Sequence, residues 1–140
     1  MYNNILLAAD GSEQNKEAVR QAVALAEKMG SKITAVYVVP NADIKPNMFG
    51  GDVGPAERQA ITEKAAKEAL DFAEAMAASK NIEFEAKLLF GKPCEAIVEV
   101  SGDYDLLICG YLGRTGLAKI MGSVAKSLIE NAKCPVLVIR

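Results

Sequence analysis

The chain has 140 residues, a common size for one compact domain, so we expect a single domain over residues 1–140. Hydrophobic residues make up 51% and charged residues 24%, which is typical of a folded globular protein and excludes a disordered chain. Sixteen basic and eighteen acidic residues give a net charge of −2, which argues against a surface for nucleic acid or anionic membranes, and the absence of histidine excludes a Ser-His-Asp or Cys-His catalytic unit.

The first part of the chain alternates between a strand pattern and a helix pattern. Asn4–Ala9 is a short apolar run, long enough for a strand and too short for a helix. Ser12 is a good N-cap for a helix whose apolar residues recur at helical spacing until Gly30 ends it. Lys32–Val39 is rich in β-branched residues and predicts the second strand.

A segment of different composition follows the second strand. Pro40 to Gly54 contains two prolines, three glycines and two asparagines, and we predict a mobile surface loop there. Pro55 suits the first turn of a long helix that runs to about Ser79. The apolar stripe expected on this helix consists of Ile61, Ala65, Phe72 and Met76, widened by Ala66, Leu70, Ala73 and Ala77.

The remainder of the chain repeats the alternation. The predicted elements are a strand over Ile82–Phe90, a helix over Pro93–Ser101, a strand over Asp105–Gly110, a helix that begins at Gly122-Ser123 and a last strand over Pro135–Arg140. The fourth strand is apolar on both faces, as expected of a central strand in a parallel sheet. In the last helix, Val124, Leu128 and Ile129 are expected to face the core.

This order of elements predicts the fold class. Strand and helix alternate four times before a closing strand, which indicates an α/β fold with a five-stranded parallel sheet and helices on both faces. In a sheet of strand order 3-2-1-4-5, the order reverses between strands 1 and 4, and ligands bind beyond the carboxyl ends of the strands at that point. Here Asp10–Ser12 and Gly110–Gly116 border the expected crevice.

The second of these segments has the composition of a phosphate site. Glycines allow the backbone to approach a phosphate closely, and Gly122-Ser123 opens a helix whose free N–H groups favour anions. Arg114 and Lys119 could neutralise phosphate charge. Most glycine-rich turns are ordinary loops, so the placement at the crevice is what favours binding. Asp10 could be a turn or capping residue, a hydrogen-bonding partner of a base or sugar, or both.

The cysteines, the first residues and the length of the apolar stretches together indicate where the protein resides. Cys94, Cys109 and Cys134 form no CxxC pair and lie among aliphatic residues, so we expect buried thiols. The first residues have no basic region and only a short apolar run, unlike a signal peptide. No apolar stretch reaches the ~20 residues of a membrane span. We therefore expect a cytoplasmic protein with no membrane segment.

Two stretches of the sequence resemble a known family. The opening reads ILLAADGSEQNKEAV and the last part reads DLLICGYLGRTGLAKIMGSVAKSLIENAKCPVLVIR, and both resemble universal stress proteins of the UspA type. The resemblance extends over the whole chain. It implies an adenine nucleotide alpha hydrolase-like fold with a five-stranded parallel sheet, a homodimer, and a regulatory role in the stress response. Some members of the family bind ATP and others do not.

The ATP-binding members carry a glycine motif that this chain matches with one departure. The motif is Gly-2x-Gly-9x-Gly-Ser/Thr; Gly110 and Gly113 match its first two glycines, and Gly122-Ser123 match its last pair. Only eight residues separate Gly113 from Gly122, one fewer than in the motif. By resemblance, Asp10 matches the acidic residue near the adenosine. The positions matching those around the base are Ala8, Ala9 and Val38.

Three functions are weighed on this basis. The first is a regulatory module that binds ATP, with Mg²⁺, without strong catalysis. The second is a family member without nucleotide that acts through protein contacts, which the short glycine motif favours. The third is an enzyme such as an ATPase. The sequence disfavours it, because there is no histidine or Walker A motif and because Glu130 and Asp105 are expected to point away from the phosphates.

The last strand also predicts an assembly. Val136–Ile139 is apolar, has no charge except the adjacent Arg140, and is expected at the edge of the sheet. Such an edge invites pairing with another chain, so we predict a homodimer in which Val136–Arg140 pairs with its copy about a two-fold axis.

Overall fold

The computed structural model describes residues 2–40, 54–112 and 121–140. Within these residues the elements are β1 (Asn4–Ala8), α1 (Glu13–Met29), β2 (Lys32–Val39), α2 (Pro55–Ala78), β3 (Phe84–Phe90), α3 (Pro93–Ser101), β4 (Leu106–Gly110), α4 (Ser123–Asn131) and β5 (Val136–Ile139). Each described element lies within about two residues of its predicted bounds. Most of the predicted loop over 40–54 lies outside the described residues.

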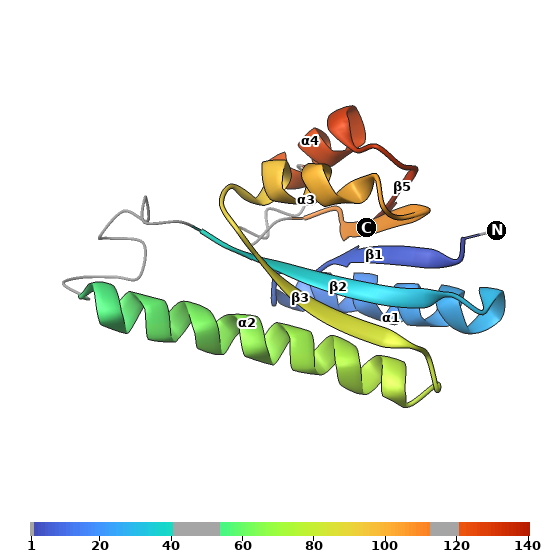
Figure 1. The fold of residues 1–140 in the computed structure, drawn as a ribbon, viewed down its shortest axis with the longest axis horizontal. Helices are drawn as coiled ribbons and strands as arrows, with labels where there is room; N and C mark the ends of the chain where they lie inside the picture. The colour runs from blue at the N-terminus through green and yellow to red at the C-terminus, as the bar shows by residue number, and fades with distance from the viewer. Residues whose placement is uncertain (1, 41–53, 113–120) are drawn as a thin grey trace.

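The five strands form one parallel sheet of order β3-β2-β1-β4-β5, as predicted (Figure 1). β1 is central and pairs with β2 on one side and with β4 on the other. β3 and β5 are the two edges. The order reverses between β1 and β4, which places the expected crevice beyond the carboxyl ends of these two strands.

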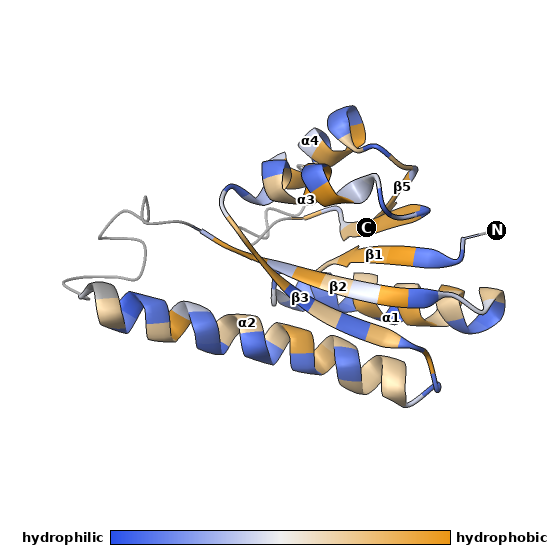
Figure 2. Ribbon diagram, viewed as in Figure 1, coloured by the Kyte–Doolittle hydropathy of each residue, from blue (hydrophilic) through white to orange (hydrophobic). Residues whose placement is uncertain are grey.

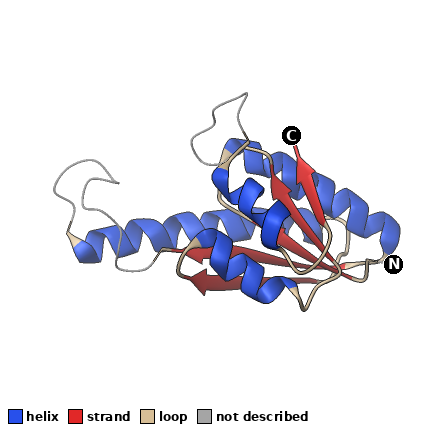
Figure 3. Ribbon diagram, turned by 90° about the horizontal axis from the view of Figure 1, so that it is seen from above, coloured by secondary structure: helices blue, strands red, loops and turns tan. Residues whose placement is uncertain are grey.

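Two helices cover each face of the sheet, and Figure 3 shows the strands between them. Under α1 and α2, the buried strand residues are Ile5, Leu7, Ile33, Ala35, Tyr37, Leu106, Ile108 and Ile139. Under α3 and α4, they are Leu6, Ala8, Val36, Val38, Leu107 and Cys109. β1, β2 and β4 are therefore apolar on both faces, as parallel strands covered by helices must be (Figure 2).

Helix α1 begins and ends where the sequence predicts. The Ser12 hydroxyl oxygen accepts a hydrogen bond from the Asn15 backbone N–H at 3.1 Å, which caps the first turn. Gly30 adopts the left-handed conformation, with φ of 68°, and its N–H donates to the Ala26 carbonyl oxygen.

The predictions of which helix faces are buried are confirmed in part. On α2, the predicted Ala66, Leu70, Ala73 and Ala77 are buried, together with Thr62 and Ala69, whereas the predicted Ile61 is 44% exposed. The buried side chains are mostly small, so the helix can lie close to β2 and β3. On α4, Ile129 is 50% exposed, because Ala125 and Leu128 form the buried pair and Ile129 lies a further ~100° around the helix.

The cysteines are less uniform than expected. Only Cys109 is buried, while Cys94 and Cys134 are half-buried. Burial raises the pKa of the Cys109 thiol to about 11, so this side chain stays protonated at neutral pH. Among the described helices, none combines the length and the hydrophobicity that a membrane span needs.

Candidate functional site

The described parts of the two segments predicted to border the crevice, residues 10–12 and 110–112, lie close to one another. β1 pairs with β4 through Leu7 and Ile108, so the chain leaves both strands at the same edge of the sheet. A Cβ atom placed on Gly110 would lie 3.9 Å from the Asn15 Cα atom and 4.0 Å from its Nδ2 atom. The end of β4 is therefore in contact with the first turn of α1.

The turn after β1 is built on Asp10. β1 ends at Ala8, so Asp10 lies just beyond the strand. Its Oδ1 atom accepts hydrogen bonds from the Ser12 N–H at 2.8 Å and from the Ser12 hydroxyl at 2.7 Å. Its Oδ2 atom makes no hydrogen bond within the described part of the chain. Asp10 is thus a turn residue that still presents one free carboxylate oxygen.

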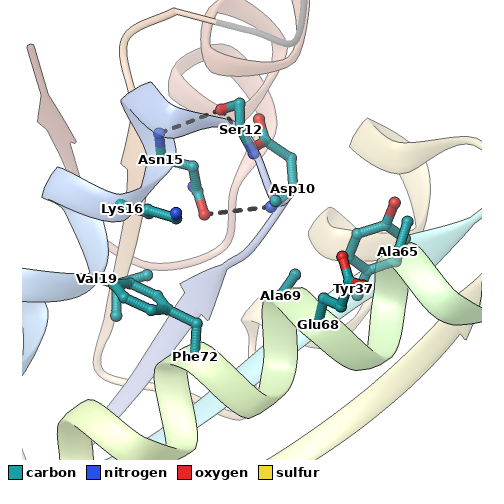
Figure 4. A pocket seen from close by; sticks show the side chains of 11 residues that line it. Asp10, Ser12, Asn15, Lys16, Val19, Tyr37, Ala65, Glu68, Ala69 and Phe72 are labelled. Atoms are coloured by element: carbon teal, nitrogen blue, oxygen red, sulfur yellow. Dashed lines mark hydrogen bonds between the residues drawn. The ribbon is translucent and has the colours of Figure 1, made fainter.

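Asn15 closes this turn and was not singled out from the sequence. Its Oδ1 atom accepts from the Asp10 N–H at 3.2 Å (Figure 4). Its Nδ2 atom donates to the Ala8 carbonyl oxygen at 2.9 Å. The residue is only 5% exposed. The signal was available, since Asn15 is a polar residue in the helical stripe that continues with Ala18, Val19 and Ala22.

Strand β2 extends past the end of β1 at Val38. The last pair between the two strands is Ala8 with Val36, and the Ala9 N–H donates to the Val36 carbonyl oxygen. Because backbone groups alternate in direction along a strand, Val38 points its N–H and C=O toward the same side as Val36. None of the described strands pairs with Val38 on that side, so its N–H and C=O extend beyond the end of β1.

The residue that follows β4 is hydrogen-bonded to the end of β5 and to the start of α4. The Tyr111 N–H donates to the Ile139 carbonyl oxygen at 2.6 Å, and the Gly122 N–H donates to the Tyr111 carbonyl oxygen at 2.9 Å. Gly122 is the N-cap of α4, with no side-chain capping bond and no acidic residue in the first turn. Ser123, the first helical residue, is exposed. The structure therefore brings Gly110, Gly122 and Ser123 to one edge, while Gly113, Arg114, Gly116 and Lys119 lie outside the described residues.

A separate cavity of about 480 Å³ lies between α1 and α2 (Figure 4). Val19, Tyr37 and Phe72 supply much of its apolar lining, and Asp10 is part of its polar wall. It lies on the face of the sheet opposite to α3 and α4. Val38, Gly110 and Gly122 do not line it, so it adjoins the crevice without being part of it.

The described residues give little support to acid–base or metal chemistry at this edge. The Asp105 Oδ2 atom accepts from the Asn4 N–H at 2.9 Å, at the amino end of the strands, which is the opposite edge of the sheet. Glu130 lies in the last turn of α4, away from its first turn. Within residues 2–40, 54–112 and 121–140, no three His, Cys, Asp or Glu side chains gather as metal ligands would.

Comparison with known proteins identifies relatives along the whole chain. The model of the universal stress protein family matches residues 1–140. A universal stress protein of Methanocaldococcus jannaschii is 34% identical, over 100% of this chain and 83% of the relative. The solved structure of the hypothetical protein MJ0577 superimposes with a TM-score of 0.84 at 26% identity, over 99% of this chain and 96% of that one.

A further solved structure is that of the universal stress protein from Archaeoglobus fulgidus in complex with dAMP. It is 26% identical to this chain, with a TM-score of 0.72, and the match covers 99% of this chain and 98% of that one. These neighbours share the adenine nucleotide alpha hydrolase-like fold with the parallel sheet described above.

Proposed function

The chain belongs to the universal stress protein family, and we propose that it is a regulatory module of the stress response that binds ATP without strong catalysis. One observation supports this most directly. Four features of the described residues lie at the edge of the sheet where its strand order reverses. They are an Asp10 carboxylate oxygen and a Val38 peptide edge without a hydrogen bond to any described residue, Gly110, and the start of α4, which no described side chain caps.

The base would lie against the end of β2. The Watson–Crick edge of adenine offers an acceptor nitrogen beside an amino donor, and the Val38 N–H and C=O are a complementary donor and acceptor. Ala8 and Ala9 are small and buried, so they leave room for a flat ring beside them. The Asp10 Oδ2 atom would accept a hydrogen bond from a ribose hydroxyl.

The phosphates would lie at the start of α4. The first backbone N–H groups of a helix are free, and the helix dipole favours negative charge there. Neither a capping side chain nor an acidic residue competes for this position. Ser123 would add a hydroxyl donor, and Mg²⁺ would accompany the phosphates of ATP. Gly113 belongs to the same proposed site by its match to the family motif, and Arg114 is proposed to neutralise phosphate charge there.

A relative supports the choice of an adenine nucleotide. The Archaeoglobus fulgidus universal stress protein, 26% identical to this chain, is in complex with dAMP. That complex supports recognition of the adenine base, whereas the preference for a triphosphate is part of our proposal.

Nucleotide release and thermal stability test this function. Acid extraction of freshly purified protein is expected to release an adenine nucleotide. Added ATP with Mg²⁺ is expected to raise the Tm, because a ligand at a hundredfold excess over its Kd stabilises the native state by about 2.7 kcal/mol. GTP serves as the matched control and should raise the Tm less. If millimolar ATP leaves the Tm unchanged, the proposal is wrong.

A second function is favoured by one specific observation. The polar groups of Ser12 and Asn15, together with Asp10 Oδ1, are already hydrogen-bonded to one another, as they would be in a member that holds no nucleotide. The spacing of eight residues between Gly113 and Gly122 points the same way. Such a protein would act through protein contacts alone, and it would yield no nucleotide on extraction.

We also propose a homodimer through β5. The two edge strands differ, because β3 carries Lys87 and Glu85, the latter paired with Lys32 at 3.2 Å, whereas Val136–Ile139 carries no charge. Charges on an edge strand discourage pairing between sheets. Leu137 is 39% exposed beside the open edge. Light scattering at micromolar concentration is expected to give twice the monomer mass, and a monomer would contradict the proposal.

A further inference from the structure

Arg140 lies over the ring of Tyr111, with its guanidinium carbon 4.6 Å from the ring centroid. We propose that Arg140 binds the distal phosphates of the nucleotide and thereby makes the site prefer nucleotides with more phosphate groups. This inference rests on the proposed function, and it assigns a role to two residues that the glycine motif does not include.

Both side chains lie on the face of the sheet that carries α4. The hydrogen bond from the Tyr111 N–H to the Ile139 carbonyl oxygen continues the pairing of β4 with β5 past Gly110. Side chains alternate between the faces along a strand. Cys109 and Val138 pack in the cluster under α3 and α4, so Tyr111 and Arg140, each two residues further on, point to that same face.

Tyr111 also connects Arg140 to the start of α4. Its carbonyl oxygen accepts the Gly122 N–H at 2.9 Å, and Gly122 is the N-cap of the helix. Tyr111 therefore contacts Arg140 through its ring and Gly122 through its carbonyl oxygen. A chain of phosphates that begins at the first turn of α4 would extend toward the guanidinium.

Arg140 is available for such a contact. Its side chain is exposed, and none of the described carboxylates lies within 4.0 Å of it. Arg20, another described arginine that lies over an aromatic ring, is instead paired with Glu17 at 3.5 Å. Stacking on a ring orients the guanidinium plane and leaves its N–H donors at the edge free for phosphate oxygens.

The prediction is a difference between nucleotides. AMP has a single phosphate, which the start of α4 would hold, so the loss of Arg140 should change its affinity little. ATP adds two further phosphates and their charge. Hydrogen bonds to a charged group contribute enough that Arg140→Ala should weaken ATP binding about tenfold.

Calorimetric titration of the full chain with ATP, ADP and AMP tests the inference. Arg140→Ala is expected to lower ATP affinity about tenfold and AMP affinity less than about twofold, with ADP in between. Arg140→Lys keeps the charge but not the fork geometry and should fall between the two. Tyr111→Phe should behave as the wild type, and Tyr111→Ala should weaken ATP binding in part. Arg20→Ala is the matched control, an arginine over a ring on the opposite face, and should change no affinity.

Each remaining outcome counts against the inference. Equal losses of ATP and AMP affinity in Arg140→Ala would indicate a general effect and overturn it, as would unchanged ATP affinity. The Tm of each variant, expected to equal that of the wild type for the exposed Arg140, separates these outcomes from unfolding. Absence of binding of any nucleotide to the wild type would instead overturn the proposed function itself.

Discussion

Helices α1 and α4 begin at the same edge of the sheet, on opposite faces, and their first turns are built differently. α1 has a serine N-cap whose hydroxyl bonds the Asn15 N–H, and Glu13 in its first turn complements the helix dipole. α4 has a glycine N-cap, no side-chain capping bond and no acidic residue in its first turn.

Because of this difference, we expect the start of α1 to contribute mainly to stability and the start of α4 mainly to nucleotide binding. The polar groups at the start of α1 are used within the fold, so substitutions there should mainly lower the free energy of unfolding. No described side chain caps the N–H groups at the start of α4, so substitutions there should mainly lower nucleotide affinity. The following variants test this division, from the largest expected effect to the smallest.

Asn15→Ala should have the largest effect, and on stability. It leaves the Asp10 N–H and the Ala8 carbonyl oxygen without their partner in a buried position, which should lower the free energy of unfolding by about 2–4 kcal/mol. Urea denaturation measures this change. Gln14→Ala, an exposed amide one residue away, should lie within about 0.5 kcal/mol of the wild type. Equal free energies of unfolding for the two variants would show that the hydrogen bonds of Asn15 do not stabilise the fold.

Gly122→Asp should make the start of α4 resemble that of α1. Gly122 has extended backbone angles, φ −62° and ψ 151°, which suit an aspartate N-cap, so stability should rise by a few tenths of a kcal/mol. The new carboxylate would repel phosphates, and ATP affinity should fall by at least about tenfold in calorimetry. Gly122→Asn caps without the charge and should retain most of the affinity. If both variants bind ATP as the wild type does, the phosphates lie elsewhere.

Ser12→Ala and Ser123→Ala compare the two serines directly. Ser12→Ala removes a capping bond and should lower the free energy of unfolding by about 1 kcal/mol. Ser123→Ala removes no capping bond and should leave stability within about 0.5 kcal/mol, while ATP affinity falls about threefold to tenfold. Thermal unfolding with and without ATP measures both quantities. The opposite pattern would reverse the division between the helices.

Gly110→Ala should have the smallest effect on stability. Its added Cβ atom would meet its nearest neighbour, the Leu112 carbonyl oxygen, at 3.6 Å, which is ordinary van der Waals contact, so the change should be within about 0.5 kcal/mol. If the ligand needs close approach to this glycine, ATP affinity will fall in calorimetry without loss of stability. Gly11→Ala is the contrast, because its φ of 78° strains alanine by about 1 kcal/mol. Unchanged affinity in Gly110→Ala would mean that the phosphates do not approach it.

The fold could be predicted because hydrophobic periodicity determined it. Short apolar runs between helical repeats specified the strands, and the parallel order 3-2-1-4-5 was expected from connection rules and the family resemblance. The buried stripe of α2 was harder to assign. Alanines and a threonine pack closely on the sheet, while the larger Ile61, which a hydrophobicity pattern ranks first, is displaced to the surface.

The arrangement of the candidate site could be predicted only in part. Turn residues after strands 1 and 4 indicated the edge of the sheet at which the structure brings Asp10, Gly110 and Gly122 together, and Ser12 was recognised as a cap. Asn15 was missed because its bonds to Ala8 and Asp10 depend on how the turn folds back, which no spacing rule encodes. The contact of Arg140 with Tyr111 depends on the pairing of β4 with β5 and on side-chain direction, so it too needed the structure.

The hydrogen bond between Gly122 and Tyr111 has a consequence for how this family can vary. It fixes both ends of the connection between β4 and α4 at 2.9 Å, whatever the number of residues that join them. The free energy of closing such a connection changes only slowly with its length. Insertions and deletions between these two anchors can therefore leave α4 in its place, so the spacing of eight rather than nine residues does not by itself decide between the two candidate functions.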